Sequence, residues 1–452
     1  MSTRAGTLVA AAVTVLLAGS VGVARADEVE AKEVIVGEER VEAPPAAAPE
    51  PEPEEECCTI PPLQYFDRTV NDVTSWLAEP GREIILSTGL STAFQWDFND
   101  PPNGKIPYRA LSTNEGDYEV ELFQLRIGYN LDPEPGEVGG NVTFDAGRIA
   151  RNVKADWNGS GVIPDTDWEH QEAELQEAYL LYNVPVGNGI TLKGGRFSTL
   201  LGAEVIEPWL NPNFSRGYLF GYAIPFTHTG GYATYPLTEM VSLSMGGVIG
   251  WDNVTDNNAR PSGIGQIALT PSKYATLTLS GIAGPEQTCA PKPGVLPTLD
   301  GQGCNENMRG VFDAVLNVMP MEDVGVILNF DYGSESQASL IHPGRHAPWV
   351  GFSGIATYQL DDCFSFALRG EWFQDPQAAR LKAVNDAGDL TGATVWDVTF
   401  DAKAMLSEYI YLRAEYRYDG SNQKIFTSRT NDFDEIALRG QNTVAVELGY
   451  YF

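Results

Sequence analysis

Charged residues that could act on a solute recur at every second position in several segments of the C-terminal half. Arg413, Glu415 and Arg417 share one face of the segment 408–419, and neighbouring segments carry further charges at the same spacing. The other members are Arg369, Glu371, Asp401, Lys403 and Glu447. Around an enclosed aqueous space, such charges would create a transverse field that orients polar solutes. Across adjacent strands, they would instead form ion pairs that stiffen a wall.

Catalytic and metal-binding chemistry finds little support in the sequence. His342 and His346 have the spacing of two metal ligands on one helix, but the Pro-Gly pair between them prevents a helix. The acidic residues of the segment 165–170 are typical of a solvated loop. No nucleophile-elbow, zinc-protease or phosphate-loop motif occurs. We therefore predict no enzyme, no metal and no cofactor.

The composition excludes several classes of protein. The 452 residues carry 61 Asp and Glu against 29 Lys and Arg, and the net charge of −32 disfavours binding to nucleic acid. After the N-terminus no run of about 18 apolar residues occurs, which excludes a helical membrane protein. The 19 Tyr, 19 Phe, 9 Trp and 46 Gly favour many strands joined by tight turns.

Residues 1–26 have the form of a secretory signal peptide. Arg4 precedes the apolar run 8–17, and Ala24-Arg25-Ala26 supplies the small residues of a cleavage site. The mature protein is therefore expected to be exported, to a compartment in which disulfide bonds persist.

The next two segments are predicted to lie outside the main domain. Residues 27–60 are rich in Pro and Glu, cannot form a packed core, and predict a disordered acidic spacer. Residues 61–80 carry apolar side chains at helical spacing and predict one short amphipathic helix. Residues 84–452 then form a single larger domain.

Within this domain, segments of about ten residues alternate between apolar and polar side chains. Near the C-terminus, Val444, Val446 and Leu448 share one face, while Ala445 and Glu447 share the other. The pattern predicts an all-β fold, and weak alternation in four segments leaves fourteen or eighteen strands open. The sixteen expected strands lie near residues 84–98, 118–130, 139–150, 172–184, 189–199, 230–236, 240–252, 263–270, 273–284, 308–319, 324–333, 348–360, 363–375, 394–406, 408–419 and 441–452.

The connections between these segments alternate strictly between long and short. The long ones hold about 10 to 30 residues, while Val186-Gly187-Asn188 and Pro271-Ser272 are examples of the short ones. Long loops at one rim and short turns at the other are typical of a transmembrane β-barrel. A soluble sandwich shares the apolar alternation but not this order of lengths. A sheet can span a bilayer only when it closes, so we predict a transmembrane antiparallel β-barrel of about sixteen strands around an aqueous channel.

The third long connection, 200–229, has an unusual composition. It contains six aromatic residues within eighteen positions, too many for a loop exposed to water. We predict that this loop folds into the barrel and forms a constriction that offers Glu204, Glu207 and Arg216 to the channel. A lid across the outer mouth, or a contact with a neighbouring subunit, is the alternative.

Arg196 follows a pair of glycines in the expected strand 189–199. Strict alternation would direct it toward lipid together with Ile190 and Leu192, where a charge is costly. We expect a β-bulge at Gly194-Gly195 that turns Arg196 into the lumen.

The five cysteines allow one clear pairing. Cys289 and Cys304 lie in the same long loop, and a disulfide between them would contribute about 3 kcal/mol in the chain-entropy model. Cys57 and Cys58 are adjacent and cannot easily bridge each other. Cys363 then remains for an intermolecular bond or a free thiol.

Two sets of motifs resemble known proteins. Tyr450-Tyr451-Phe452, with alternating apolar residues before it, resembles the signal by which the barrel assembly machinery recognises bacterial outer-membrane barrels. Motifs between residues 194 and 252 resemble the β-barrel porin-2 (outer-membrane porin L-like) family, which implies a channel-forming protein of the outer membrane. These motifs are Gly194-Gly195-Arg196-Phe197-Ser198-Thr199, Gly202-Ala203-Glu204, Asn211-Pro212-Asn213-Phe214-Ser215-Arg216, Thr227-His228-Thr229-Gly230 and Gly250-Trp251-Asp252.

Together these features predict a passive porin for small hydrophilic solutes or ions in the outer membrane of a Gram-negative-type bacterium. By analogy with general porins, we expect a homotrimer surrounded by outer-membrane lipid. The alternative is a non-conducting barrel that serves surface structure or adhesion through its long acidic loops. An outer-membrane enzyme ranks third.

Overall fold

Sixteen antiparallel strands form one closed barrel, which confirms the predicted fold class and strand number. The computed structural model describes residues 84–155, 172–258, 260–288, 303–431 and 434–452. The expected signal peptide, acidic spacer and short helix lie outside the described residues. The barrel strands are β1 (Ile84–Asp97), β2 (Tyr118–Tyr129), β3 (Val138–Ala146), β4 (Ala173–Val184), β5 (Ile190–Ser198), β6 (Thr227–Thr238), β7 (Val241–Val248), β8 (Ser262–Ser272), β9 (Ala275–Pro285), β10 (Met308–Met321), β11 (Val324–Glu335), β12 (Ala347–Gln359), β13 (Phe364–Asp375), β14 (Ala393–Met405), β15 (Ile410–Ser421) and β18 (Gly440–Tyr451).

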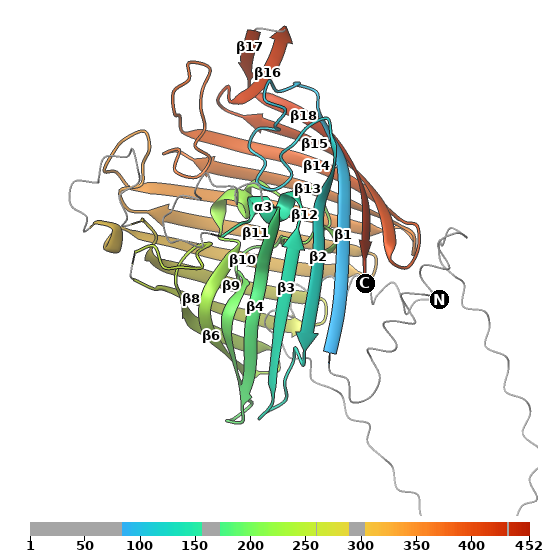
Figure 1. The fold of residues 1–452 in the computed structure, drawn as a ribbon, viewed down its shortest axis with the longest axis vertical. Helices are drawn as coiled ribbons and strands as arrows, with labels where there is room; N and C mark the ends of the chain where they lie inside the picture. The colour runs from blue at the N-terminus through green and yellow to red at the C-terminus, as the bar shows by residue number, and fades with distance from the viewer. Residues whose placement is uncertain (1–83, 156–171, 259, 289–302, 432–433) are drawn as a thin grey trace, which may run out of the picture.

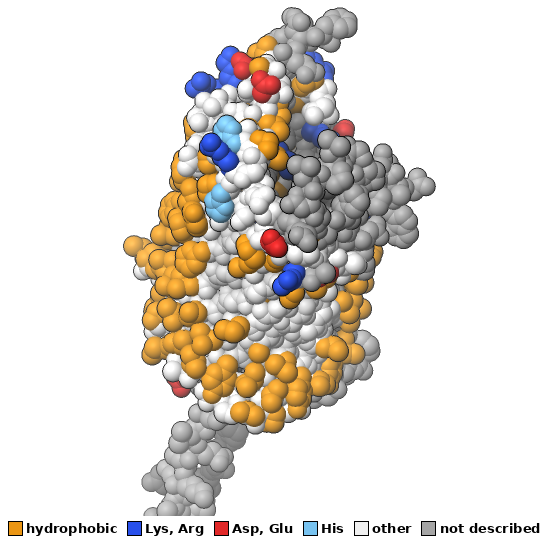
Figure 2. Space-filling model, turned by 90° about the vertical axis from the view of Figure 1, so that its left-hand side faces the viewer, with side chains coloured by type: hydrophobic (Ala, Val, Ile, Leu, Met, Phe, Trp, Pro, Cys, Tyr) orange, Lys and Arg blue, Asp and Glu red, His pale blue; other side chains and the backbone are white. Residues whose placement is uncertain are grey.

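The alternation of side chains separates an outer flank from an inner one. In β14, Val398 and Phe400 are 51% and 46% exposed, whereas Asp397 and Asp401 are each 1% exposed. On the face shown in Figure 2, apolar side chains spread over much of the barrel, and most of the charged side chains lie toward one end. A continuous apolar flank of this kind is suited to hydrocarbon rather than to water.

The barrel closes between its first and last strands. β1 pairs with β18 from Gly89 opposite Tyr451 to Asp97 opposite Thr443. Closure leaves no sheet edge with unpaired backbone groups, as a bilayer requires. No helix among the described residues is long and apolar enough to cross a membrane.

Long loops and short turns lie at opposite ends of the barrel. The last long loop carries the hairpin of β16 (Phe426–Asn431) and β17 (Asp434–Leu438), which projects from one end, while the C-terminus lies toward the other (Figure 1). This hairpin is not among the strands expected from the sequence, because its two strands are too short to show an alternating pattern.

Glycines end two strands earlier than expected. β3 stops at Ala146 rather than at residue 150, because Gly147 has a φ of 118° and the chain then forms α3 (Arg148–Asn152). A Cβ at Gly147 would lie 2.9 Å from the carbonyl oxygen of Glu121, so this turn requires glycine. β7 stops at Val248 rather than at residue 252, before Gly250, whose φ is 115°.

The β-bulge expected at Gly194-Gly195 is absent, so this prediction was wrong. The pairing of β5 with β4 and with β6 continues through both glycines without a shift. Instead Gly195 adopts a φ of 136°, and the Arg196 side chain is buried, with Nη2 2.5 Å from Oε1 of Glu174. One glycine in a left-handed conformation thus removes the charge from the lipid-facing flank without an extra residue.

Candidate functional site

The third long loop, defined here as loop 3 (residues 199–226), lies inside the barrel. Phe214, Tyr218 and Phe220 are only 1%, 1% and 3% exposed. The ring of Trp209 packs against Gly89 of β1, where a Cβ would come within 2.3 Å of it. The short helix η3 (Leu219–Ala223) contacts β11 and β12 on another part of the wall. Loop 3 therefore extends from β5 across the lumen. Its aromatic side chains are buried there, as the aromatic content of the loop predicted.

Three wall arginines hold the backbone of loop 3 through its carbonyl groups. Arg369 donates from Nη1 to the carbonyl oxygen of Ser215 at 2.5 Å. Arg413 donates from Nη1 to that of Asn211 at 2.8 Å, and Arg417 donates from Nη1 to the backbone oxygen at position 216, also at 2.8 Å. All three arginines are at most 1% exposed. Their guanidinium groups are thus committed to the loop rather than open to a passing solute.

Wall carboxylates hold the same loop through its N–H groups. Glu371 accepts from the backbone N–H of Tyr218 and, at 2.7 Å, from that of Leu219. Asp401 accepts from the backbone N–H of Phe214 at 3.1 Å, and its second oxygen accepts from the side chain of Asn213. Charge-assisted hydrogen bonds of this kind contribute about 1.5–3 kcal/mol each. The alternating charges of the wall therefore form a socket for an irregular backbone.

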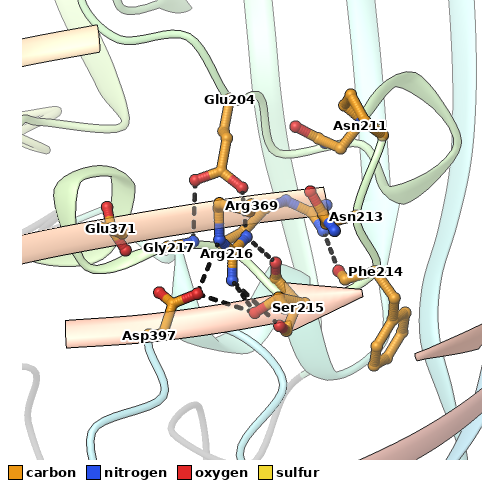
Figure 3. A network of polar contacts seen from close by, with 12 residues as sticks. Glu204, Asn211, Asn213, Phe214, Ser215, Arg216, Gly217, Arg369, Glu371 and Asp397 are labelled. Carbon is orange, nitrogen blue, oxygen red and sulfur yellow. Dashed lines mark hydrogen bonds and ion pairs between the residues drawn. The ribbon is translucent and has the colours of Figure 1, made fainter. Parts of the chain in front are cut away.

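The charged side chains of loop 3 also take part in this socket (Figure 3). Glu204 accepts from the backbone N–H of Gly217 at 2.8 Å and forms an ion pair with Arg369 at 2.9 Å. Arg216 donates to three carbonyl oxygens of its own loop, one of them that of Val205 at 2.8 Å. Burial lowers the pKa of Arg216 to about 10, so this guanidinium is still charged at neutral pH. Arg216 therefore acts as an internal brace of the loop.

Glu207 and Glu415 make further carboxylate contacts with the wall and with loop 3, respectively. Glu207 is only half-buried and accepts from the side-chain amides of Gln124 at 3.0 Å and Gln176 at 3.2 Å. Glu415 accepts from the backbone N–H of Ser215 at 2.9 Å. Of the carboxylates predicted on loop 3, Glu207 thus keeps the largest share of exposed surface.

Cross-strand ion pairs support the socket from behind. Glu447 is fully buried, lies opposite Arg413 in the β15–β18 register, and accepts from its Nε at 2.7 Å. Arg417 pairs with Asp419 at 2.7 Å and with Asp397 at 3.4 Å. This geometry favours the ion-pair interpretation of the alternating charges over a field that acts directly on solutes, since a field of that kind needs accessible groups.

Arg196 and Lys403 stand apart from the network of wall arginines and carboxylates around loop 3. Arg196 pairs with Glu174 as described above. Lys403 is half-buried, and its ammonium group lies 4.4 Å from the ring centre of Tyr411 and 5.6 Å from that of Tyr451. The twelve predicted residues thus separate into a socket around loop 3 and these two outliers.

One important residue escaped the sequence analysis. Arg109, in the first long loop (residues 98–117), is 7% exposed and reaches into the barrel. It pairs with Asp419 at 3.3 Å and donates to the hydroxyl groups of Ser215 at 3.2 Å and Thr443 at 2.7 Å. No alternation exists in a loop of this kind, so the sequence carries no signal for where Arg109 points. Burial lowers its pKa, although Asp419 opposes this effect.

The C-terminal residues pair with β1, and two cysteines of the described residues form disulfide bonds. The backbone N–H of Phe452 donates to the carbonyl oxygen of Thr88 at 3.0 Å, and Tyr450 lies opposite Leu90, so the predicted assembly signal completes the closing strand pair. Cys304 and Cys363 each take part in a disulfide bond, so the free thiol expected as one possibility for Cys363 was wrong. The predicted Cys289–Cys304 pairing stays a prediction, because Cys289 lies outside the described residues.

Two carboxylates inside the barrel face each other, and no cation among the described residues forms an ion pair with either. Asp313 and Asp331 are register partners on β10 and β11, and both are 0% exposed. Asn329 donates to Asp313 at 2.7 Å, but neither oxygen of Asp331 has a hydrogen-bond donor among the described residues. Like charges in this arrangement repel unless they share a proton.

We expect Asp331→Asn to raise the thermal midpoint of unfolding, by the equivalent of about 1 kcal/mol or more, because it removes one of two buried like charges. The gain should be larger in alkaline buffer, where a shared proton is lost. Heat-dependent gel mobility measures the midpoint. The control Asp375→Asn should lower it, since Asp375 accepts three backbone N–H groups, from Ala379, Arg380 and Leu381. A lower midpoint for Asp331→Asn would contradict the prediction.

Among the described residues, no group of three or more His, Cys, Asp or Glu side chains could hold a metal ion. His228 is buried, and its ring nitrogens contact the Thr199 hydroxyl at 3.0 Å and the carbonyl oxygen of Gly250 at 2.9 Å. The contact with Thr199 holds the start of loop 3 next to β6, which begins just after the loop ends.

Comparisons with known proteins agree with this architecture. The chain is similar to OprB of Pseudomonas putida, at 10% identity and a TM-score of 0.53, over 85% of this chain and 97% of that one. It is also similar to the outer membrane channel DcaP of Acinetobacter baumannii, at 10% identity and a TM-score of 0.52, over 82% and 97% of the two chains. At such low identity these structures show the fold alone.

A family model gives the more specific result. No curated protein matches the sequence. The model described as "Putative beta-barrel porin-2, OmpL-like" matches residues 84–452, which is the whole barrel. The motifs between residues 194 and 252 had indicated the same family from loop 3 and its surroundings. The chain therefore belongs to the OmpL-like beta-barrel porin-2 family.

Proposed function

We propose that the protein is an outer-membrane pore for the passive diffusion of small hydrophilic solutes or ions, and that loop 3 narrows this pore. The observation that carries the proposal is the attachment of loop 3 across the inside of a closed barrel of sixteen strands. Sixteen strands enclose more space than their side chains fill. An inward loop is then the element that sets the width of the passage.

Family membership supports the location and the general role. The outer membrane of a Gram-negative-type bacterium is where porins of this architecture work, and the apolar flank provides the surface that its lipid would cover. The tyrosine-rich C-terminus supports recognition by the barrel assembly machinery.

Single-channel recording in planar bilayers tests the proposal. We expect the purified protein to produce discrete conductance steps in a simple salt solution. Correct folding is checked on the same preparation by the shift in gel mobility between unheated and boiled samples. A folded protein that produces no steps would overturn the proposed pore.

One observation favours the alternative of a non-conducting barrel. The first long loop also folds inward, because Arg109 bonds to Ser215 of loop 3, and Ile106 and Leu111 are 3% and 2% exposed. Two inward loops in contact could close the lumen and leave the outer loops as the working surface. This second function predicts a correctly folded protein that produces no conductance steps in planar bilayers.

We also propose a homotrimer, by analogy with general porins. Native mass spectrometry of the protein released from detergent measures the number of copies. A single mass that corresponds to one chain would contradict this assembly.

A further inference from the structure

A cavity lies beneath loop 3, on the side of the short turns. Trp209, Leu210 and Pro212 form its roof, and the turn residues Lys273 and Asp323 lie at its other end. The cavity encloses about 200 Å³ and reaches the wall at β14 and β18. A solute that moves through the barrel would pass this space on the periplasmic side of loop 3.

The wall of this cavity is more apolar than the lumen around loop 3. Apolar side chains that line it come from five different segments of the chain. They are Trp209, Ile327, Ala367, Met405 and Tyr451. Small-molecule sites typically combine such a lining with a few polar groups that fix orientation.

Lys403 supplies the polar group. Lys403 lines the cavity, its ammonium group lies over the rings of Tyr411 and Tyr451, and no described carboxylate forms an ion pair with it. This arrangement differs from that of Arg369, which is fully buried and bonded to Glu204 and Asp397. An ammonium group has three donors, and π-contacts with rings leave these donors available to an anion.

The nearest carboxylates are already committed. Both oxygens of Asp401 accept hydrogen bonds from loop 3. Glu447 accepts from Arg413, Ser91 and Tyr411. Neither group therefore competes for Lys403 through a direct ion pair.

We propose that this cavity is a binding site for monocarboxylates with an apolar or aromatic body, held with the carboxylate on Lys403 and the body against Trp209, Met405 and Tyr451. The site deepens the proposed pore function by naming one solute class, and it rests on that function. Lys403 offers one positive charge to one carboxylate. The second lysine of the cavity, Lys273, lies in a turn at the other end, where Glu322, Asp323 and Asp362 disfavour a second negative charge on the ligand.

Isothermal titration of the detergent-solubilised full-length protein with benzoate tests the site. We expect benzoate to bind, and benzyl alcohol, which has the ring without the charge, to bind much more weakly. Lys403→Met keeps the length and apolar stem of the side chain, and should weaken benzoate binding about tenfold or more.

Lys193→Met is the matched control. Lys193 also lies over two rings, 4.2 Å from that of Tyr179 and 5.6 Å from that of Tyr232, but it does not line the cavity. Its replacement should leave benzoate binding unchanged. Equal loss in both variants would overturn the proposal, because it would indicate a general effect of lumen charge, and unchanged binding in Lys403→Met would overturn it directly.

Bilayer recordings separate this inference from the proposed function. Conductance steps without benzoate binding would leave the pore standing and refute the site. Benzoate binding that depends on Lys403, in a folded protein that gives no steps, would support the site and refute the pore.

Discussion

Replacing Arg369 with methionine is expected to release loop 3 from the wall and to raise the single-channel conductance. Arg369 is fully buried and bonds to Glu204, Asp397 and the backbone of Ser215. Its removal leaves the buried Glu204 without a cation and Asp397 with Arg417 alone, which costs about 3–5 kcal/mol. A cost of this size changes the docking equilibrium of the loop more than a hundredfold.

Arg309→Met provides the control for this experiment. Arg309 also pairs with a carboxylate, Glu335 at 2.8 Å, but this pair joins β10 to β11, includes no residue of loop 3 and is partly exposed. We expect normal conductance from this variant. Protease treatment of both folded variants gives a second readout, since only a released loop should be cut within residues 199–226. Unchanged conductance and unchanged protection in Arg369→Met would contradict the role assigned to the socket.

The strands of this barrel could be predicted from the sequence because their constraint is local. Every second side chain meets lipid, so Val446 and Leu448 of β18, or Val398 and Phe400 of β14, carry the pattern within a few neighbouring positions. The length of each connection is equally visible in the chain. These two local features are enough to predict the fold class and the number of strands. The closure of the sheet follows from the need to pair every backbone group within a bilayer.

The contacts of the site could be predicted only in part. Alternation places Arg369 and Arg417 on the inner flank, but it does not give their height in the barrel or the loop atoms that they meet. The ion pair between Arg369 and Glu204 joins residues 165 positions apart. The aromatic content of loop 3 showed that it must be buried, yet the same reasoning could not place Arg109, whose loop has no repeating pattern.

The interpretation of the charges also depends on burial, which the sequence does not report. A screened field and cross-strand ion pairs require the same residues at the same spacing. Exposures of 0% and 1% for Arg369 and Arg413 separate the two, because a fully buried guanidinium group cannot meet a solute. Lys403 lies on the same inner flank as these arginines. It differs from them because aromatic rings, rather than carboxylates, surround its charge.

Val446→Arg tests the flank on which the whole architecture depends, and it should destabilise the barrel strongly. Val446 lies at the middle of β18, is 47% exposed, and sits between Phe94 of β1 and Ala414 of β15. An arginine on the lipid face near the bilayer midplane costs about 2–4 kcal/mol. Urea titration of the protein in lipid vesicles, followed by gel mobility, measures the loss of unfolding free energy.

Val384→Arg makes the same substitution outside the barrel flank. Val384 is similarly exposed, at 42%, but lies in the loop between β13 and β14, where water surrounds the new charge. Its effect should stay within about 0.5 kcal/mol, as for ordinary surface substitutions. A similar small effect in Val446→Arg would mean that the outer flank does not meet hydrocarbon. A large loss in Val446→Arg alone requires a lipid environment around β18, because the two valines differ in surroundings and not in side chain or exposure.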